Sequence, residues 1–185
     1  MESSSPVGIG RNVLLVAATE RELSGHDGLA CGIGPVEAAA ATARTLALDR
    51  PDAVLHVGIA GGRGLGPGAV VIGIEAVYVD IAAAIPIVSS VEPDSALLRS
   101  VRAAFPDAPV LPIATSGIVG RAGLAVEAME GFAVLRACQL AGVPAVEVRA
   151  ISNEIGEEDR GSWEIERALA ALAGALPRLL AAARQ

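Results

Sequence analysis

The sequence has no lysine, and it has only two histidines, two cysteines, one tryptophan, one tyrosine and two phenylalanines among its 185 residues. Because histidine and cysteine are so scarce, no cluster of metal-ligating side chains exists, and we expect neither a metal nor a cofactor. The net charge of −7, with no basic cluster, argues against nucleic acids and anionic membranes as partners. Cys31 and Cys138 stand far apart in apolar surroundings, which is typical of buried free thiols in a reducing cytoplasm.

The sequence also lacks a continuous hydrophobic run of the roughly 18 residues that a membrane-spanning helix needs. Its longest apolar region, Ala69–Ser89, is interrupted by Glu75 and Asp80. The first residues have no basic region of the kind that opens a secretory signal. With 52% apolar and 19% charged residues, the chain fits a soluble cytoplasmic protein of one domain, which we expect at 12–185 after a loose segment at 1–11.

Short apolar runs typical of buried strands alternate with stretches of helical periodicity. We expect strands at Asn12–Ala18, Asp52–Val57, Ala69–Val79, Val110–Thr115 and Ala145–Ile151. We expect helices at Val36–Leu48, Asp94–Phe105, Ala122–Leu140 and Trp163–Arg184. Strands that are apolar on both faces are covered by helices on each side. The alternation therefore predicts an α/β fold of three layers, in which helices flank a mostly parallel sheet.

Polar residues and glycines stand at the predicted strand ends, where ligands bind in such sheets. They are Glu22, the glycine-rich segment 58–62, Ser116-Gly117 and Asn153. Each also has an ordinary structural interpretation: Glu22 as a helix start, the glycines as a tight turn, and Asn153 as a turn residue or helix cap. Glu130, which we place inside the helix 122–140, fits a residue reaching solvent as well as it fits a ligand-binding carboxylate.

The pattern becomes specific in residues 126–153, which read VEAMEGFAVLRACQLAGVPAVEVRAISN. This segment resembles the signature region of the nucleoside phosphorylase and nucleosidase family. The nearest groups are the methylthioadenosine/S-adenosylhomocysteine nucleosidases and, closer still, the futalosine hydrolases. The resemblance extends in order to VAATERE, CGIGPVEAAAATA, HVGIAGG and NEIGEEDRGSWEI. It implies a nucleoside phosphorylase-like fold, a small-molecule nucleoside as substrate, and a homodimer or homotetramer.

The resemblance also implies a role for each matching position. Glu22 would position and activate the attacking water, and Asn153 would contact the purine. Met129 and Glu130 would pack under the ribose and accept hydrogen bonds from its 2′- and 3′-hydroxyls. The remaining substrate-binding positions would flank the nucleoside, as a loop, and the 5′ side of the ribose: Gly58, Ile59, Ala60, Gly61 and Trp163.

The amide at Asn153 narrows the substrate that the resemblance implies. Relatives that act on 6-aminopurines carry Asp here, whereas an amide offers N–H to N7 or O6 and C=O to a ring N–H, which suits a 6-oxopurine. The loop that would flank the nucleoside has no hydroxyl for phosphate, which favours water as the nucleophile. We therefore expect release of hypoxanthine from futalosine in menaquinone biosynthesis. The alternatives are a methylthioadenosine/S-adenosylhomocysteine nucleosidase and a nucleoside-binding protein without turnover.

The chain is shorter than the usual family member, and the missing length falls in loops that cover the purine in relatives. A more open pocket, a pocket completed by another subunit, and low activity all remain compatible with this. Few side chains could stack on a base or cap the pocket: Tyr78, Phe105, Phe132, Trp163, His26 and His56.

Overall fold

The computed structural model describes residues 11–81, 84–120 and 123–185, so that all but the last residue of the predicted loose segment 1–11 lies outside the described residues. The strands are β1 (Val13–Ala17), β2 (Leu29–Ala30), β3 (Ala53–Gly62), β4 (Val70–Tyr78), β5 (Ser90–Val91), β6 (Val110–Thr115), β7 (Val126–Ala128) and β8 (Ala145–Glu154). The helices are α1 (Glu20–Leu23), α2 (Pro35–Leu48), α3 (Ser95–Ala104), α4 (Gly131–Ala141) and α5 (Ile165–Ala183).

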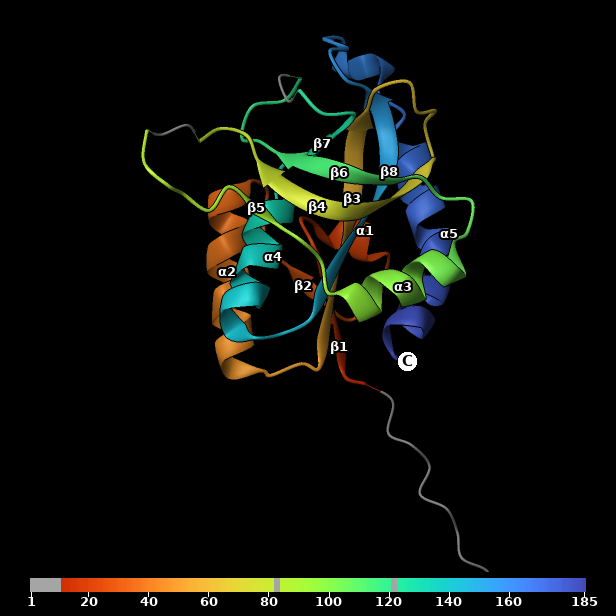
Figure 1. Cartoon of the computed structure of the whole chain (residues 1–185). Coiled ribbons are helices and arrows are strands. Elements are labelled where there is room, and N and C mark those ends of the chain that lie inside the picture. Colours follow the sequence, from red (N-terminus) through yellow and green to blue (C-terminus); the bar gives the residue numbers. More distant parts are fainter. Residues whose placement is uncertain (1–10, 82–83, 121–122) are drawn as a thin grey trace, which may run out of the picture.

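The strands form one mixed sheet in the order β2-β1-β3-β7-β6-β4-β5, and β8 pairs with both β3 and β4. Among the described residues, five of the eight strand pairings are parallel. Helices α2 and α4 cover one face of the sheet, and α3 and α5 cover the other (Figure 1). The predicted α/β class, with helices flanking a mostly parallel sheet in three layers, is confirmed.

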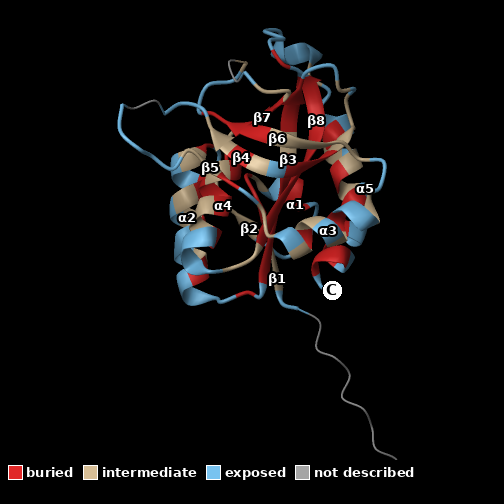
Figure 2. Cartoon of the chain, viewed as in Figure 1, coloured by how far each residue is buried: buried red, intermediate tan, exposed pale blue. Residues whose placement is uncertain are grey.

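The core follows from the apolar strands, because a strand in the middle layer buries both of its faces. Leu15, Leu55 and Val148 pack toward α3 and α5, whereas Val16 and Val54, on the opposite faces of their strands, pack toward α2 and α4. Figure 2 shows the buried residues concentrated along the strands and on the inner sides of the helices. No helix within the described ranges is both long and apolar enough to cross a lipid bilayer.

Local signals set the helix ends where the sequence predicts them. Pro35, with its fixed φ, is the first residue of α2. The Asp94 carboxylate accepts hydrogen bonds from the backbone N–H of Ala96 and Leu97 at 3.0 and 2.9 Å, which caps α3. Gly142 ends α4 in the left-handed conformation, with φ of 69°.

Three predicted boundaries are wrong. The segment Gly58–Gly61 is not a loop, because β3 runs on to Gly62 and stays paired with β8. The helix predicted at 122–140 begins only at Gly131, since residues 126–128 form β7 between β3 and β6. Asn153 does not follow its strand but lies in it. In each case, strand pairing across the sheet outweighs the local glycine and alanine content that suggested a turn or a helix.

The last predicted helix also starts later than expected. Trp163 ends a short 3₁₀ turn, Arg160–Ser162, and α5 begins at Ile165. The Asp159 side chain accepts a hydrogen bond from the backbone N–H of Gly161, which closes this separate turn. Trp163 is therefore carried by a connection between β8 and α5 and not by the helix itself.

Candidate active site

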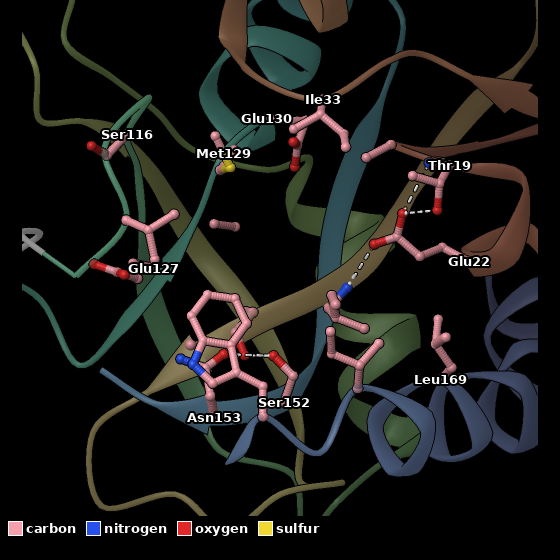
Figure 3. A pocket seen from close by; sticks show the side chains of 18 of the residues that line it. Thr19, Glu22, Ile33, Ser116, Glu127, Met129, Glu130, Ser152, Asn153 and Leu169 are labelled. Atoms are coloured by element: carbon pink, nitrogen blue, oxygen red, sulfur yellow. Dashed lines mark hydrogen bonds between the residues drawn. The ribbon is translucent and has the colours of Figure 1, made fainter. Parts of the chain in front are cut away.

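A cavity of about 350 Å³ opens at the carboxyl ends of β1, β3, β6, β7 and β8. Figure 3 shows Thr19 and Glu22 on one side of it, and Ser116 and Glu127 on the other. Most of the site residues predicted from the sequence line this cavity: Glu22, Ile59, Ala60, Gly61, Met129, Glu130, Asn153 and Trp163. Within the part of the chain that the structure describes, Gly58 is the one predicted site residue that does not line the cavity. The fold thus gathers segments that are far apart in the sequence, as the predicted class requires.

The Glu22 carboxylate is held from two sides. Its Oε2 accepts hydrogen bonds from the backbone N–H and the hydroxyl of Thr19, at 2.9 and 2.8 Å. Its Oε1 accepts a hydrogen bond from the backbone N–H of Ile59, at 2.9 Å. Because α1 follows β1 directly, this capping arrangement points the carboxylate into the cavity. Glu22 is buried, and these three donors fix the position of its carboxylate.

The Glu130 carboxylate also lies in the cavity wall, at the N-terminal cap of α4 and not inside a helix as expected. Its Oε1 accepts a hydrogen bond from the backbone N–H of Gly34 at 3.0 Å, and its Oε2 lies 3.4 Å from Nη2 of Arg149. The turn at residues 32–34 therefore helps to orient this carboxylate. Ile33 of the same turn lines the cavity.

Arg149 lies fully buried beneath the cavity and joins three other side chains in what we call the arginine cluster: Arg149, Glu130, Glu147 and His56. Its Nε donates to Oε1 of Glu147 at 2.8 Å, and its Nη2 donates to Nε2 of His56 at 2.6 Å. His56 Nδ1 lies 3.1 Å from the carbonyl oxygen of Val16, so that Nδ1 carries the proton and Nε2 accepts. Burial, together with Arg149, lowers the pKa of His56 well below its usual value.

Two glycines make room for this cluster. A Cβ at Gly131 would lie 2.3 and 2.4 Å from the two carboxylate oxygens of Glu147. A Cβ at Gly58 would lie 2.2 Å from Nη1 of Arg149. Burial raises the pKa of Glu147, an effect that the Arg149 charge opposes. Gly58 thus contributes to the site indirectly, because its missing side chain leaves the space that the Arg149 guanidinium occupies.

The space beside Gly58 brings a cation and a carboxylate together. The same Cβ at Gly58 would also lie 2.8 Å from Oε1 of Glu22, so that the Arg149 guanidinium and the Glu22 carboxylate both lie close to this glycine. Nη1 has no hydrogen-bond partner within the described part of the chain, although it is fully buried.

The opposite end of the cavity is uncharged apart from Glu127. The Asn153 side chain, which is buried, accepts a hydrogen bond at Oδ1 from the Ser152 hydroxyl at 2.7 Å and donates from Nδ2 to the Glu154 carbonyl oxygen at 3.0 Å. An amide has two N–H donors and two acceptor sites, so one of each is left for a ligand. Unlike a carboxylic acid, it cannot give up a proton.

Sequence reasoning overlooked several residues of the site. Glu147 and Arg149 stood out as two charges in an otherwise apolar strand, which is the signal that could have identified a buried ion pair. His56 gave no such signal, since a lone histidine in a strand is most often a core residue. Glu127 was hidden because its segment was assigned to a helix.

The comparisons with known proteins agree with this geometry. The family model described as the phosphorylase superfamily matches residues 28–185. A futalosine hydrolase from Streptomyces coelicolor is 36% identical over 186 aligned residues, which cover 84% of this chain and 78% of that protein. A futalosine hydrolase from Thermus thermophilus is 49% identical over a shorter match of 61 residues, or 33% of this chain and 27% of that protein.

Solved structures with lower identity share the fold. A methylthioadenosine/S-adenosylhomocysteine nucleosidase from Colwellia psychrerythraea, in complex with adenine, superposes with a TM-score of 0.83 at 21% identity, covering 95% of this chain and 96% of that one. The native futalosine hydrolase of Helicobacter pylori superposes with a TM-score of 0.82 at 18% identity, covering 92% of this chain and 97% of that one.

Proposed function

The chain belongs to the phosphorylase superfamily and, within it, to the futalosine hydrolases, and on this premise we propose that it hydrolyses the N-glycosidic bond of futalosine. The products would be hypoxanthine and dehypoxanthine futalosine, a step of menaquinone biosynthesis. The observation that carries the proposal is a pair of buried carboxylates that line the same cavity. Glu22 follows β1, and Glu130 follows β7. Asn153 at the other end of the cavity supports a 6-oxopurine as the base.

The first part of the proposed mechanism concerns the sugar. Breaking the bond between C1′ and the base nitrogen leaves positive charge on the ribose, and only interactions that strengthen with this charge lower the barrier. Glu130 would accept hydrogen bonds from the 2′- and 3′-hydroxyls and stabilise the cation, with Met129 packed beneath the ring. Gly34 and Arg149 hold Glu130 in place, so that little reorganisation is needed when the charge develops.

The second part concerns the nucleophile. We propose that the attacking water lies in the cavity beside Glu22, where it would donate a hydrogen bond to the Glu22 carboxylate. Its oxygen would bond to C1′ while its proton passes to Glu22, a general-base contribution of roughly 10²–10⁴-fold. A hydroxyl-free wall at Ile59 and Ala60 supports water and not phosphate as the nucleophile.

The third part concerns the leaving base, which takes the electron pair of the broken bond. Asn153 has no acidic proton to deliver, but its remaining N–H would donate to N7 or O6 and stabilise the purine anion. The anion would then take its proton from water. Ile59, Ala60 and Gly61 would flank the nucleoside along β3, and Trp163 would lie by the 5′ side of the ribose.

We also propose that residues 12–185 act as one domain in a homodimer or homotetramer in the cytoplasm. The cavity draws on segments from Ala18 to Leu169, which supports one domain. Ile33 and Ile118 line the cavity and are 62% and 53% exposed, and such an apolar rim favours a covering subunit. The two buried free cysteines are in keeping with a reducing compartment. Sedimentation of the purified protein would measure the assembly.

A direct assay tests the proposed reaction. Purified protein is incubated with futalosine, inosine or methylthioadenosine, with and without phosphate, and released bases are separated by chromatography. We expect hypoxanthine from futalosine at a rate that phosphate does not change. Faster release of adenine from methylthioadenosine would favour the nucleosidase alternative, and a phosphate-dependent rate would make the protein a phosphorylase. Binding without release would indicate the alternative of a binding protein.

A further inference from the structure

Three neighbouring strands place Glu127, Gly61 and Asn153 side by side at the base end of the cavity. Gly61 is directly opposite Glu127 of β7 and directly opposite Asn153 of β8. Because residues opposite one another on adjacent strands share a face of the sheet, the two side chains stand on either side of the glycine. We call these three residues the Gly61 cradle.

The missing side chain of Gly61 lets its neighbours pack closely around it. A Cβ at Gly61 would lie 3.2 Å from Ile155 Cγ1, 3.3 Å from Asn153 Nδ2 and 3.4 Å from Glu127 Cγ, so that the amide and the carboxyl side chain both lie directly against the glycine. All three residues line the cavity, and Glu127 is only 4% exposed. A base lying in the cavity over Gly61 would therefore meet both side chains along its edge.

The two sides of the cradle differ in hydrogen-bond polarity. The Asn153 atom next to Gly61 is Nδ2, a donor, while its Oδ1 is turned to the Ser152 hydroxyl. The Glu127 carboxylate is an acceptor, and the backbone N–H of Gly120 donates to its Oε1 at 2.5 Å, which fixes its position. A carboxylate has about four acceptor sites and can take further donors besides such a partner. The cradle therefore offers a donor on one side and an anionic acceptor on the other.

We propose that Glu127 selects the base by accepting the N1–H of a 6-oxopurine, while Asn153 donates to its O6 or N7. The inference rests on the proposed function and adds a specificity-determining residue to it. The sequence suggested that the Asn153 carbonyl would receive the ring N–H, but Oδ1 is engaged by Ser152. Glu127 supplies the acceptor instead. The negative charge of the leaving base would develop on the Asn153 side, away from this carboxylate.

The same cradle rejects a 6-aminopurine. The N1 atom of adenine carries no hydrogen and would meet the Glu127 carboxylate with its lone pair, and its amino group would meet the Asn153 donor. Two buried polar groups would then face the base without forming a hydrogen bond to it. Sites built on hydrogen-bond polarity discriminate in this way far more strongly than apolar pockets do.

Two arms test the proposal. In the first, calorimetry compares binding of hypoxanthine and 1-methylhypoxanthine, which differ only at N1, to the unaltered protein. We expect the methylated base to bind at least 10-fold more weakly, and equal binding would overturn the proposal. This arm needs neither a variant nor turnover, so it separates the inference from the proposed function. If futalosine is not hydrolysed but the two bases are distinguished, the proposed function fails and the inference stands.

In the second arm, Glu127→Gln is assayed with futalosine and its 6-amino analogue. Losing the charged acceptor should lower kcat/KM for futalosine by roughly 10–100-fold, while the 6-amino analogue is unchanged or improves. Glu154→Gln is the matched control, since Glu154 is exposed, also accepts a backbone N–H and does not line the cavity. An equal loss with both substrates would mean that Glu127 only holds the loop at Gly120, and would overturn the proposal.

Discussion

The arginine cluster lies beneath the cavity and reaches it through Glu130, whereas the Gly61 cradle lines the cavity, and the two differ in how they are held. The cluster is fully enclosed, with Arg149, Glu147 and His56 at most 1% exposed and bonded to one another. The cradle depends on one side chain of β7 and one near the end of β8, and on the hydrogen bond that the backbone N–H of Gly120 donates to Glu127. We infer that the cluster serves the sugar, which all nucleosides share, and that the cradle serves the base, in which they differ.

This division suggests why the ends are built so differently. Charge on the ribose develops in every turnover, so that end benefits from groups that cannot move or exchange with water. Selection of the base needs only a pattern of donors and acceptors that matches one purine and mismatches the other. Changes at the cluster should therefore affect all substrates alike, and changes at the cradle should affect the ratio between them.

The largest effect is expected for Glu22→Gln, which removes the group assigned to the water. Turnover should fall roughly 10²–10⁴-fold for futalosine and for inosine alike, with little change in KM. Initial rates of base release measure this. Glu20→Gln is the control, because Glu20 is exposed on the same short helix and does not line the cavity. Because Glu22 is assigned to the attack on the ribose, which all nucleosides share, a loss confined to one nucleoside would contradict the division between sugar and base recognition.

The next largest effect is expected in stability, from Arg149→Met. The substitution removes the cation that three buried side chains surround and leaves Glu147 and Glu130 without it. Breaking a buried pair on one side costs about 3–5 kcal/mol of unfolding free energy. Urea unfolding measures the loss. In Arg167→Met, which removes an exposed pair with Glu164, the change should stay below about 1 kcal/mol. Similar losses in the two variants would show that the cluster adds little.

At the cradle, Asn153→Asp should move the preference toward 6-aminopurines. An Asp can accept from the amino group and, when protonated, deliver a proton to N7, which an amide cannot do. We expect the ratio of kcat/KM for futalosine to that for its 6-amino analogue to fall roughly 10–100-fold. Competition between the two substrates in one tube gives the ratio directly. An unchanged preference for the hypoxanthine nucleoside would contradict the assignment of Asn153 as a residue that selects a 6-oxopurine.

The smallest effect concerns pH and isolates His56 within the cluster. Its folded-state pKa lies well below the usual 6.5, so its contribution to stability is present above that pH and lost as the pH falls below it. The slope from this residue is at most about 1.4 kcal/mol per pH unit. Glu147 acts oppositely, since burial raises its folded-state pKa above 4.5. We measure the unfolding free energy of the unaltered protein and of His56→Gln by urea unfolding from pH 7 to 5. The difference between the two curves cancels the contribution of Glu147 and leaves that of His56, so the unaltered protein should lose more stability as the pH falls. Parallel curves would contradict the assignment.

The fold was largely predictable because apolar runs such as Val13–Ala17 and Ala53–Val57 leave few alternatives to buried strands. The wrong boundaries all concern residues whose conformation depends on pairing. Four of the five residues at 58–62 are glycine or alanine, which do not mark a strand, and β8 supplies the partner that keeps the segment extended. The strand at residues 126–128 is held by β3 and β6, which are distant in the sequence.

The candidate site was predictable where it depended on a resemblance and not where it depended on packing. Glu22, Glu130 and Asn153 stand at matching motif positions, and all three line the cavity. The bond of Arg149 to His56 could not be foreseen, because it depends on the register between β3 and β8 and on the room left by Gly58. The cradle has the same origin, since strand register alone puts Glu127 opposite Gly61.

One measurement tests the account most directly: the ratio of kcat/KM for futalosine to that for its 6-amino analogue in the unaltered protein. The two compounds share the ribose and the 5′ substituent, so the arginine cluster treats them alike and only the cradle can separate them. The account predicts a preference for futalosine on the order of 10³–10⁵-fold, with hypoxanthine as the released base. A ratio near one, or a preference for the amino compound, would contradict it.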